Sequence, residues 1–260
     1  MPAVFVAHGS PMLAVEEDDF TRSLRRATAA LRPGTIVIVS AHWEAPAPVR
    51  VGTSDQPSLI YDFGGFPDEL YRVAYPCPGN PGVAREVLQL LRSTGIAAEE
   101  EPARGLDHGA WVPLRHAFPE ATVPVVEVSL PRPRNPSELL AIGRALAPLR
   151  DRGVLLVGSG GIVHNLRRVR FEDKNASVDP WARSFDGWVR ARLGEGDVQA
   201  LVDYRKRAPE AAASVPTPEH FDPLFVVLGA MERGEGIRDV YEGFHYGNLS
   251  MRSFASSPKA

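Results

Sequence analysis

The sequence predicts one α/β domain over residues 1–260, built on a largely parallel central sheet. Three short apolar runs, at residues 4–7, 35–41 and 154–157, have the β-branched composition of strands that are buried on both faces of a parallel sheet. Segments with the helical spacing of apolar residues separate these runs. Alternation of strand and helix is typical of an α/β domain, and no repeat, linker or low-complexity segment divides the chain.

The first half of the chain predicts two strands, two helices and a short edge strand. The strand at 4–7 precedes a helix over 18–31, which ends before Pro33-Gly34. The second strand covers 36–41, and the alternation at 49–51 predicts a short edge strand. Asn80-Pro81-Gly82 opens a second helix, which Gly95 ends.

The second half of the chain continues the same alternation. We expect strands over 123–130 and 154–157, separated by a helix over 136–149. Two further helices are expected over 179–193 and 219–233. These elements are enough to cover both faces of a parallel sheet.

Composition excludes several classes of protein and predicts a cytoplasmic location. The hydrophobic fraction is 44%, the charged fraction is 23% and the formal net charge is -3, so nothing indicates binding to nucleic acid or to an anionic membrane. No apolar stretch approaches the roughly 20 residues that span a bilayer, and the first residues do not resemble a signal peptide. Cys77 is the only cysteine. Any metal must therefore be bound by His, Asp or Glu.

The apolar strand runs lead into histidines, and this arrangement predicts a metal site. His8, His42 and His164 each follow a predicted strand within a few residues, and ligands of open α/β sheets gather at the carboxyl ends of strands. An isolated histidine is more often buried with a satisfied hydrogen bond, and this is the interpretation of His116. His220 follows Pro-Thr-Pro at a predicted helix start, where an exposed histidine is equally expected and Glu219 is an alternative oxygen ligand. A site rich in imidazole suits Zn, Fe, Cu or Ni.

The glycine-rich segment 158–161 matches two known motifs only in part. It follows a strand, but Val163 stands where the third glycine of a dinucleotide-binding fingerprint belongs. Val157 stands where a nucleophile elbow around Ser159 needs its first glycine. The sequence therefore predicts neither a dinucleotide cofactor nor a serine nucleophile.

Six motifs in order along nearly the whole chain resemble those of the class III extradiol ring-cleavage dioxygenases, specifically the 4,5-DOPA extradiol dioxygenase branch of the LigB superfamily. The motifs are His8-Gly9-Ser10-Pro11-Met12-Leu13-Ala14, Ser40-Ala41-His42-Trp43-Glu44, Leu106-Asp107-His108-Gly109-Ala110-Trp111-Val112-Pro113-Leu114, His164-Asn165-Leu166, Pro216-Thr217-Pro218-Glu219-His220-Phe221 and Tyr246-Gly247-Asn248-Leu249-Ser250-Met251.

The resemblance implies a single catalytic domain with one mononuclear metal ion, Fe(II) in the active form and Zn(II) as an alternative in the isolated protein. It places metal ligands at His8, His42 and His220. His164 matches a proposed acid/base and is also readable as a fourth ligand, while His108 matches a histidine of the pocket wall that contacts substrate or oxygen. The implied reaction inserts O2 into a small aromatic catechol, DOPA or a related compound.

The chain departs from the family pattern at two positions, which leaves the substrate open. Tyr61 and Val215 stand where many relatives carry a histidine. Another catechol or a protocatechuate-like acid is therefore as consistent with the resemblance as DOPA. The aromatic segments 61–66 and 71–78 are candidates for a lid over the substrate ring, and ordinary loop packing is the alternative.

Two other functions are compatible with the same histidines. One is a metal-binding protein of this fold that acts in interaction or redox signalling without catalysis. The other is a zinc-dependent hydrolase, in which three histidines activate a water molecule. The oligomeric state does not follow from the sequence.

Overall fold

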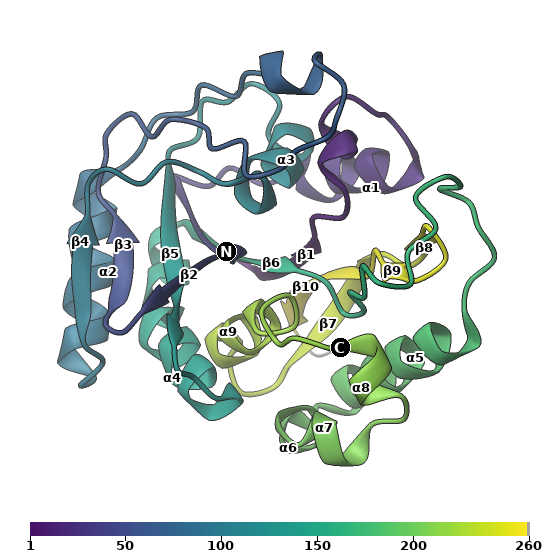
Figure 1. Ribbon diagram of the computed structural model, residues 1–260. Helices are drawn as coiled ribbons and strands as arrows, with labels where there is room; N and C mark the ends of the chain where they lie inside the picture. Colours follow the sequence, from purple (N-terminus) through teal and green to yellow (C-terminus); the bar gives the residue numbers. More distant parts are fainter. Residues whose placement is uncertain (259–260) are drawn as a thin grey trace.

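An eight-stranded sheet forms the centre of the computed structural model, which describes residues 1–258 (Figure 1). The strand order is β4-β3-β5-β2-β6-β1-β10-β7, and a separate two-stranded ribbon pairs β8 with β9. The strands are β1 (Ala3–Ala7), β2 (Thr35–Pro46), β3 (Val49–Gly52), β4 (Ala98–Glu101), β5 (Val125–Arg132), β6 (Val154–Gly160), β7 (Glu235–Tyr241), β8 (Phe244–His245), β9 (Leu249–Ser250) and β10 (Ser253–Pro258).

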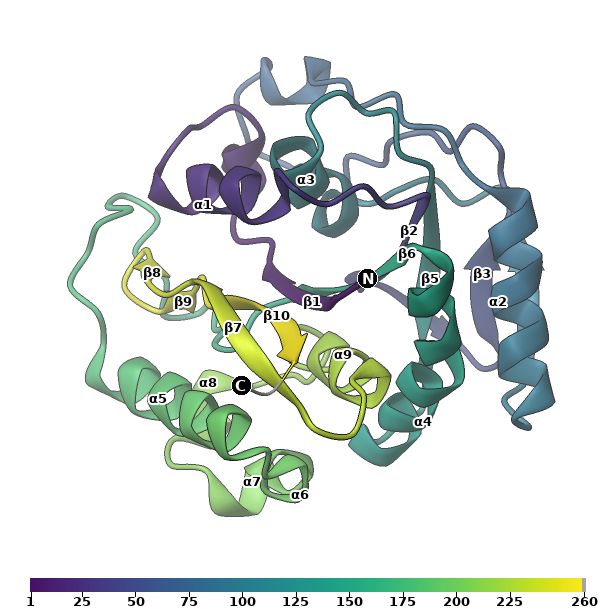
Figure 2. The same ribbon diagram turned by 180° about the vertical axis from the view of Figure 1, so that it is seen from behind.

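The expectation of a largely parallel sheet is confirmed for its centre, where β5, β2, β6 and β1 run parallel. Antiparallel strands complete both sides: β3 pairs with β5, and β10 and β7 extend the sheet beyond β1 (Figure 2). The strands β7 and β10 were not expected from the sequence. They are rich in polar and small residues, as antiparallel strands near a sheet edge often are, and so lack a continuous apolar run.

Helices cover both faces of the sheet. In Figure 1, α1 and α3 lie above the sheet, while α4, α5 and α9 lie below it. Alternation along β2 supports this layering, because Ile36 and Ile38 pack in the core beneath α1 and α3, whereas Val37 and Val39 pack in the opposite core. The helices are α1 (Asp19–Thr28), α2 (Pro81–Ser93), α3 (His108–Ala117), α4 (Pro136–Leu146), α5 (Pro180–Glu195), α6 (Val198–Val202), α7 (Tyr204–Arg207), α8 (Ala211–Ser214) and α9 (Pro223–Ala230).

Short 3₁₀ helices complete the element list. They are η1 (Pro11–Ala14), η2 (Leu70–Arg72) and η3 (Ala147–Arg152). The helix predicted over 136–149 is α4 continued by the first residues of η3. No helix within residues 1–258 has both the length and the apolar character to span a membrane.

Two predicted elements differ from the structure. The segment 49–51 is not an edge strand, because β4 pairs with β3 on its outer side. The helix predicted over 219–233 is shorter, since α9 begins at Pro223 and ends at Ala230. Residues before Pro223 form a turn, in which the backbone N–H groups of Phe221 and Asp222 both donate to Pro218 O at 2.9 Å.

Candidate metal centre

Neighbouring strands at the middle of the sheet position His8 and His42. His8 directly follows β1, and its backbone N–H donates to Gly160 O of β6 at 3.2 Å. His42 lies within β2 and not after its end, which corrects the strand end expected at residue 41. The pairing of β2 with β5 shifts register between Val39 and Glu44, and such an irregularity re-aims the side chains that it contains.

The glycine-rich end of β6 brings His220 to the same place. A Cβ atom at Gly160 would overlap the carbonyl oxygen of His220, and one at Gly158 would overlap that of Pro223. Gly161 N–H donates to His220 O at 2.7 Å, which fixes the turn against the strand. The glycine-rich segment 158–161 therefore lets the turn that carries His220 approach β6 closely, because glycine has no side chain.

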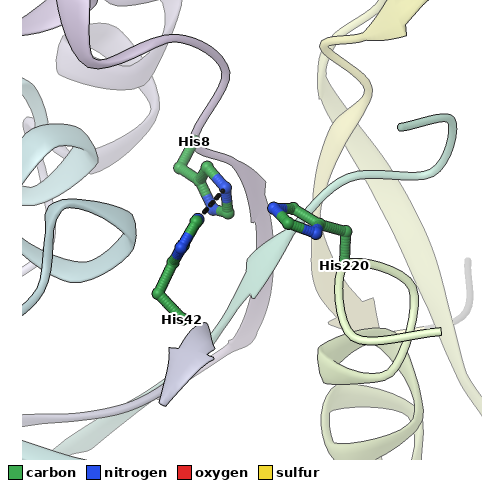
Figure 3. A group of neighbouring side chains, drawn as sticks. All are labelled: His8, His42 and His220. Atoms are coloured by element: carbon green, nitrogen blue, oxygen red, sulfur yellow. Dashed lines mark hydrogen bonds between the residues drawn. The ribbon is translucent and has the colours of Figure 1, made fainter. Parts of the chain in front are cut away.

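The side chains of His8, His42 and His220 point toward one another (Figure 3). One nitrogen from each ring lies within 4.8 Å of the other two. The Nε2 atoms of His8 and His42 are 3.1 Å apart. Among the described residues, the buried Nε2 of His220 has no hydrogen-bond partner. One ring nitrogen from each of the three histidines therefore faces the same small space between the side chains.

The opposite nitrogen of each ring faces an oxygen, which favours a tautomer with the lone pair on Nε2. Ser159 donates its hydroxyl hydrogen to Gly109 O at 2.5 Å, so at 3.1 Å its oxygen accepts from His8 Nδ1. Glu219 lies 3.2 Å from His220 Nδ1. His42 Nδ1 lies 3.4 Å from Asp62 Oδ2. Oxygen partners that orient imidazoles in this way are typical of metal ligands.

The separation of His8 and His42 and the charge state of all three rings fit a metal ion. Nitrogens bound to one ion at about 2.0–2.1 Å lie about 2.9–3.4 Å apart for angles between square and tetrahedral, and the His8–His42 separation falls in that range. Burial, followed by the neighbouring imidazoles, lowers the pKa of His8 and of His220 well below the ordinary value. Burial also lowers the pKa of His42 to about 4. All three rings are therefore neutral at pH 7, as metal ligands must be.

His164 lies beside this group, with its ring stacked on that of His220 at a centroid distance of 3.4 Å and an interplanar angle of 6°. The set of nitrogens that lie within 4.8 Å of one another includes His8, His42 and His220 but not His164. Burial, and next the interaction with His42, lowers the pKa of His164 to about 4. It is thus a neutral base adjacent to the group, and its role stays a prediction.

A second group joins His42, Asp62 and His108. Asp62 Oδ1 accepts from both the backbone N–H and Nδ1 of His108, each at 2.9 Å. Burial raises the pKa of Asp62, but the hydrogen bonds and charge of His108 outweigh it and lower the pKa to about 2. Since Asp62 Oδ1 is engaged by His108, this group is better described as a carboxylate that orients two imidazoles. No role was predicted for Asp62 from the sequence, because its contacts with His42 and His108 arise only in the folded chain.

A cavity of about 600 Å³ is lined by five histidines, which are His8, His42, His108, His164 and His220. Phe63 and Phe66 of the predicted lid segment 61–66 line it, whereas Tyr61 turns away and donates its hydroxyl to Val73 O at 2.7 Å. No residue of the segment 71–78 lines this cavity, so ordinary packing describes it better. Val215 is buried in the core and does not line the cavity either.

The remaining histidines lie elsewhere. His116 in α3 is buried and its Nε2 donates to Leu13 O at 2.6 Å, which confirms its interpretation as a satisfied core histidine. His245 Nε2 lies 3.4 Å from Asp18 Oδ2.

Comparison with known proteins agrees with this architecture. Residues 2–252 match the family described as "Catalytic LigB subunit of aromatic ring-opening dioxygenase". The chain is 42% identical to "4,5-DOPA dioxygenase extradiol" of Escherichia coli K12, over 97% of this chain and 93% of that protein. It is 36% identical to the protein of the same name from Beta vulgaris, over 96% and 94% of the two chains. A crystal structure of an uncharacterized Escherichia coli K12 protein superposes with a TM-score of 0.83 at 36% identity, covering 99% of this chain and all of that one. The chain therefore belongs to the LigB family of aromatic ring-opening dioxygenases.

Proposed function

We propose that this protein is an extradiol dioxygenase that cleaves the ring of a catechol with both atoms of O2. The observation that carries the proposal is the convergence of three neutral imidazoles on the wall of a cavity large enough for an aromatic ring. We assign His8, His42 and His220 as ligands of one ion, Fe(II) in the active enzyme, with Zn(II) as a substitute in isolated protein. Family membership supports the ring-opening class of reaction.

The protein contributes orientation and proton transfer. When bound, the metal supplies open coordination positions at which a catechol and O2 meet. His164 is neutral at pH 7, so it can accept the proton that a catechol hydroxyl loses on binding. His108 also lines the cavity, and because Asp62 engages its Nδ1, Nε2 is the nitrogen left for a substrate hydroxyl or oxygen. The product expected is a ring-opened muconic semialdehyde that keeps both oxygen atoms.

The proposal is tested by loading the protein anaerobically with Fe(II) and adding a panel of catechols and O2. We expect oxygen uptake together with a yellow product. His8→Ala and His42→Ala should lose both metal and turnover. His164→Gln should keep most of the metal and lose turnover if His164 is the base, and it should lose metal if His164 is a ligand.

The other functions predict different results. Tight metal binding with no oxygen uptake across the panel would contradict the proposal and favour a non-catalytic metal protein. Ester or amide hydrolysis with zinc, but not with iron, would favour a zinc hydrolase. Retention of metal in both His8→Ala and His42→Ala would overturn the ligand assignment.

A further inference from the structure

The cavity beside the histidines has apolar walls away from the metal group. Phe63 and Phe66 line one side, and their rings pack edge to face at a centroid distance of 5.5 Å. Leu166 and Phe171 also line the cavity, and they remain 54% and 58% exposed. Large apolar side chains left exposed at a cavity are a common mark of a surface that binds an apolar ligand.

Away from the proposed metal ligands, the cavity provides no basic side chain for an acidic ring substituent. Within residues 1–258, no Lys or Arg side chain lines it, and its single carboxylate, Asp62, is already engaged by His108. The other polar lining groups include the neutral hydroxyls of Ser10 and Tyr246. A carboxylate placed against these apolar walls would lose part of its hydration without gaining a counter-ion, which is unfavourable.

The basic side chains of segment 166–174, which also carries Leu166 and Phe171, do not line the cavity. Lys174 forms ion pairs with Glu16 and Asp18, the latter at 2.7 Å. Arg170 pairs with Asp179 at 2.9 Å. These cations are therefore neutralised by partners that the structure already supplies.

Two further arginines of this segment face a different hollow. Arg167 and Arg168 line it together with Arg205, and it is separate from the cavity that Leu166 lines. Leu166 thus belongs to the apolar rim of the cavity, whereas the two arginines that follow it belong to a basic surface outside the cavity.

From these observations we propose that the cavity selects catechols whose ring substituent is uncharged and apolar, with the substituent lying against Leu166 and Phe171. The proposal rests on the function proposed above and narrows its substrate class. DOPA carries both an ammonium and a carboxylate on its substituent, so it should be a poor substrate for this chain. A volume of about 600 Å³ leaves space for a substituent beyond the catechol ring.

The first test measures binding apart from turnover. Zinc has no redox chemistry, so zinc-loaded protein can be titrated calorimetrically with 4-ethylcatechol, 3,4-dihydroxyphenylacetate and dopamine, which share a two-carbon substituent and differ in charge. We expect 4-ethylcatechol to bind at least about tenfold more tightly than the acid, because the carboxylate has no partner. The same order is expected for kcat/KM with iron-loaded enzyme. Tighter binding of the acid or of dopamine would overturn the proposal.

The second test moves a cation onto the rim. Leu166→Arg should improve binding of 3,4-dihydroxyphenylacetate by about tenfold relative to 4-ethylcatechol. Leu166→Gln, which is polar but uncharged, is the matched control and should not show this gain. Metal content is measured in both variants to verify that the site is intact.

The outcomes separate this inference from the proposed function. Cleavage of acidic catechols in preference to 4-ethylcatechol would contradict the inference and leave the dioxygenase assignment standing. Absence of oxygen uptake with every catechol would contradict the assignment, while the binding order with zinc would still decide the inference. If Leu166→Arg fails to favour the acid, the substituent does not lie against this rim.

Discussion

At the scale of single residues, the contribution of Asp62 to the orientation of His42 and His108 can be measured with one substitution. It accepts two hydrogen bonds from His108 and lies 3.4 Å from His42 Nδ1. Asp62→Asn keeps the size of the side chain and removes its charge. We expect turnover to fall by about 10- to 100-fold, as is typical when a partner that orients an active imidazole is lost.

The contrast between Asp62→Asn and a ligand variant distinguishes orientation from metal binding. Metal content should fall much less in Asp62→Asn than in His42→Ala, because Asp62 faces His42 Nδ1 but is not one of the three proposed ligands. The pH profile of turnover should also change, since the carboxylate fixes which nitrogen of His108 carries a proton. Unchanged turnover and an unchanged profile would contradict a positioning role.

The sequence predicted the residues that converge better than it predicted their partners. His8 and His42 could be grouped because each follows a β-branched run, and the resemblance added His220. Ser159 and Asp62 could not be assigned roles, because each acts on a histidine far away in the chain. Such partners depend on side-chain positions that only the folded sheet defines.

At the scale of elements, Arg134 joins the two segments that carry His42 and His220. Its Nε donates to Asp222 Oδ2 at 2.6 Å, and its Nη1 lies 2.7 Å from Glu44 Oε1. Asp222 is two residues from His220, and Glu44 is two residues from His42. The guanidinium therefore holds β2 and the turn before α9 together.

Removing this guanidinium should destabilise the fold. Arg134→Met leaves the buried carboxylate of Asp222 without a cation, and loss of one partner of a buried ion pair costs about 3–5 kcal/mol. Burial already raises the pKa of Asp222 to about 6 even though Arg134 lowers it, so protonation of Asp222 will offset part of the cost. We expect a loss near the lower end of that range in urea unfolding at pH 7.

A neighbouring arginine provides the control. Arg132 lies 3.9 Å from Glu44 and its side chain is 56% exposed, so Arg132→Met should change stability by less than about 1 kcal/mol. Equal losses of unfolding free energy in the two variants would show that the burial of Arg134 adds nothing to the stability of the fold. Metal affinity should fall in Arg134→Met only if the two segments move apart.

Strands and helices could be predicted from the sequence where one pattern of apolar residues, that of a strand or that of a helix, covers the whole segment. The apolar runs of β1, β2 and β6 and the capped helices α2 and α4 follow from local sequence. The end of α9 did not, because Met231, Glu232 and Arg233 are all compatible with a helix up to Gly234, whereas the helix ends at Ala230. The bulge in β2 depends on pairing with β5, which lies far away in the sequence.

At the scale of the whole molecule, burial lowers the pKa of several histidines, and this makes the stability of the fold depend on pH. His245 is an example outside the metal group: burial, followed by the charge of Lys174, lowers its pKa to about 4, although Asp18 acts in the opposite direction. The unfolded chain has a histidine pKa of about 6.5. Between these two values the unfolded state binds a proton that the folded state does not, so stability falls as pH falls through this window.

Replacing His245 should reduce that dependence. One proton corresponds to a slope of up to about 1.4 kcal/mol per pH unit, so in metal-free protein the free energy of unfolding of His245→Gln should fall less steeply between about pH 6 and pH 5 by roughly that amount. Asp18, whose pKa is lowered, loses its contribution only at lower pH and does not obscure the window. Above about pH 7.5 the imidazole is neutral in both states, so the difference between the two proteins should become constant. Urea unfolding at several pH values measures both slopes, and parallel curves from pH 5 to pH 8 would show that folding leaves the proton affinity of His245 unchanged.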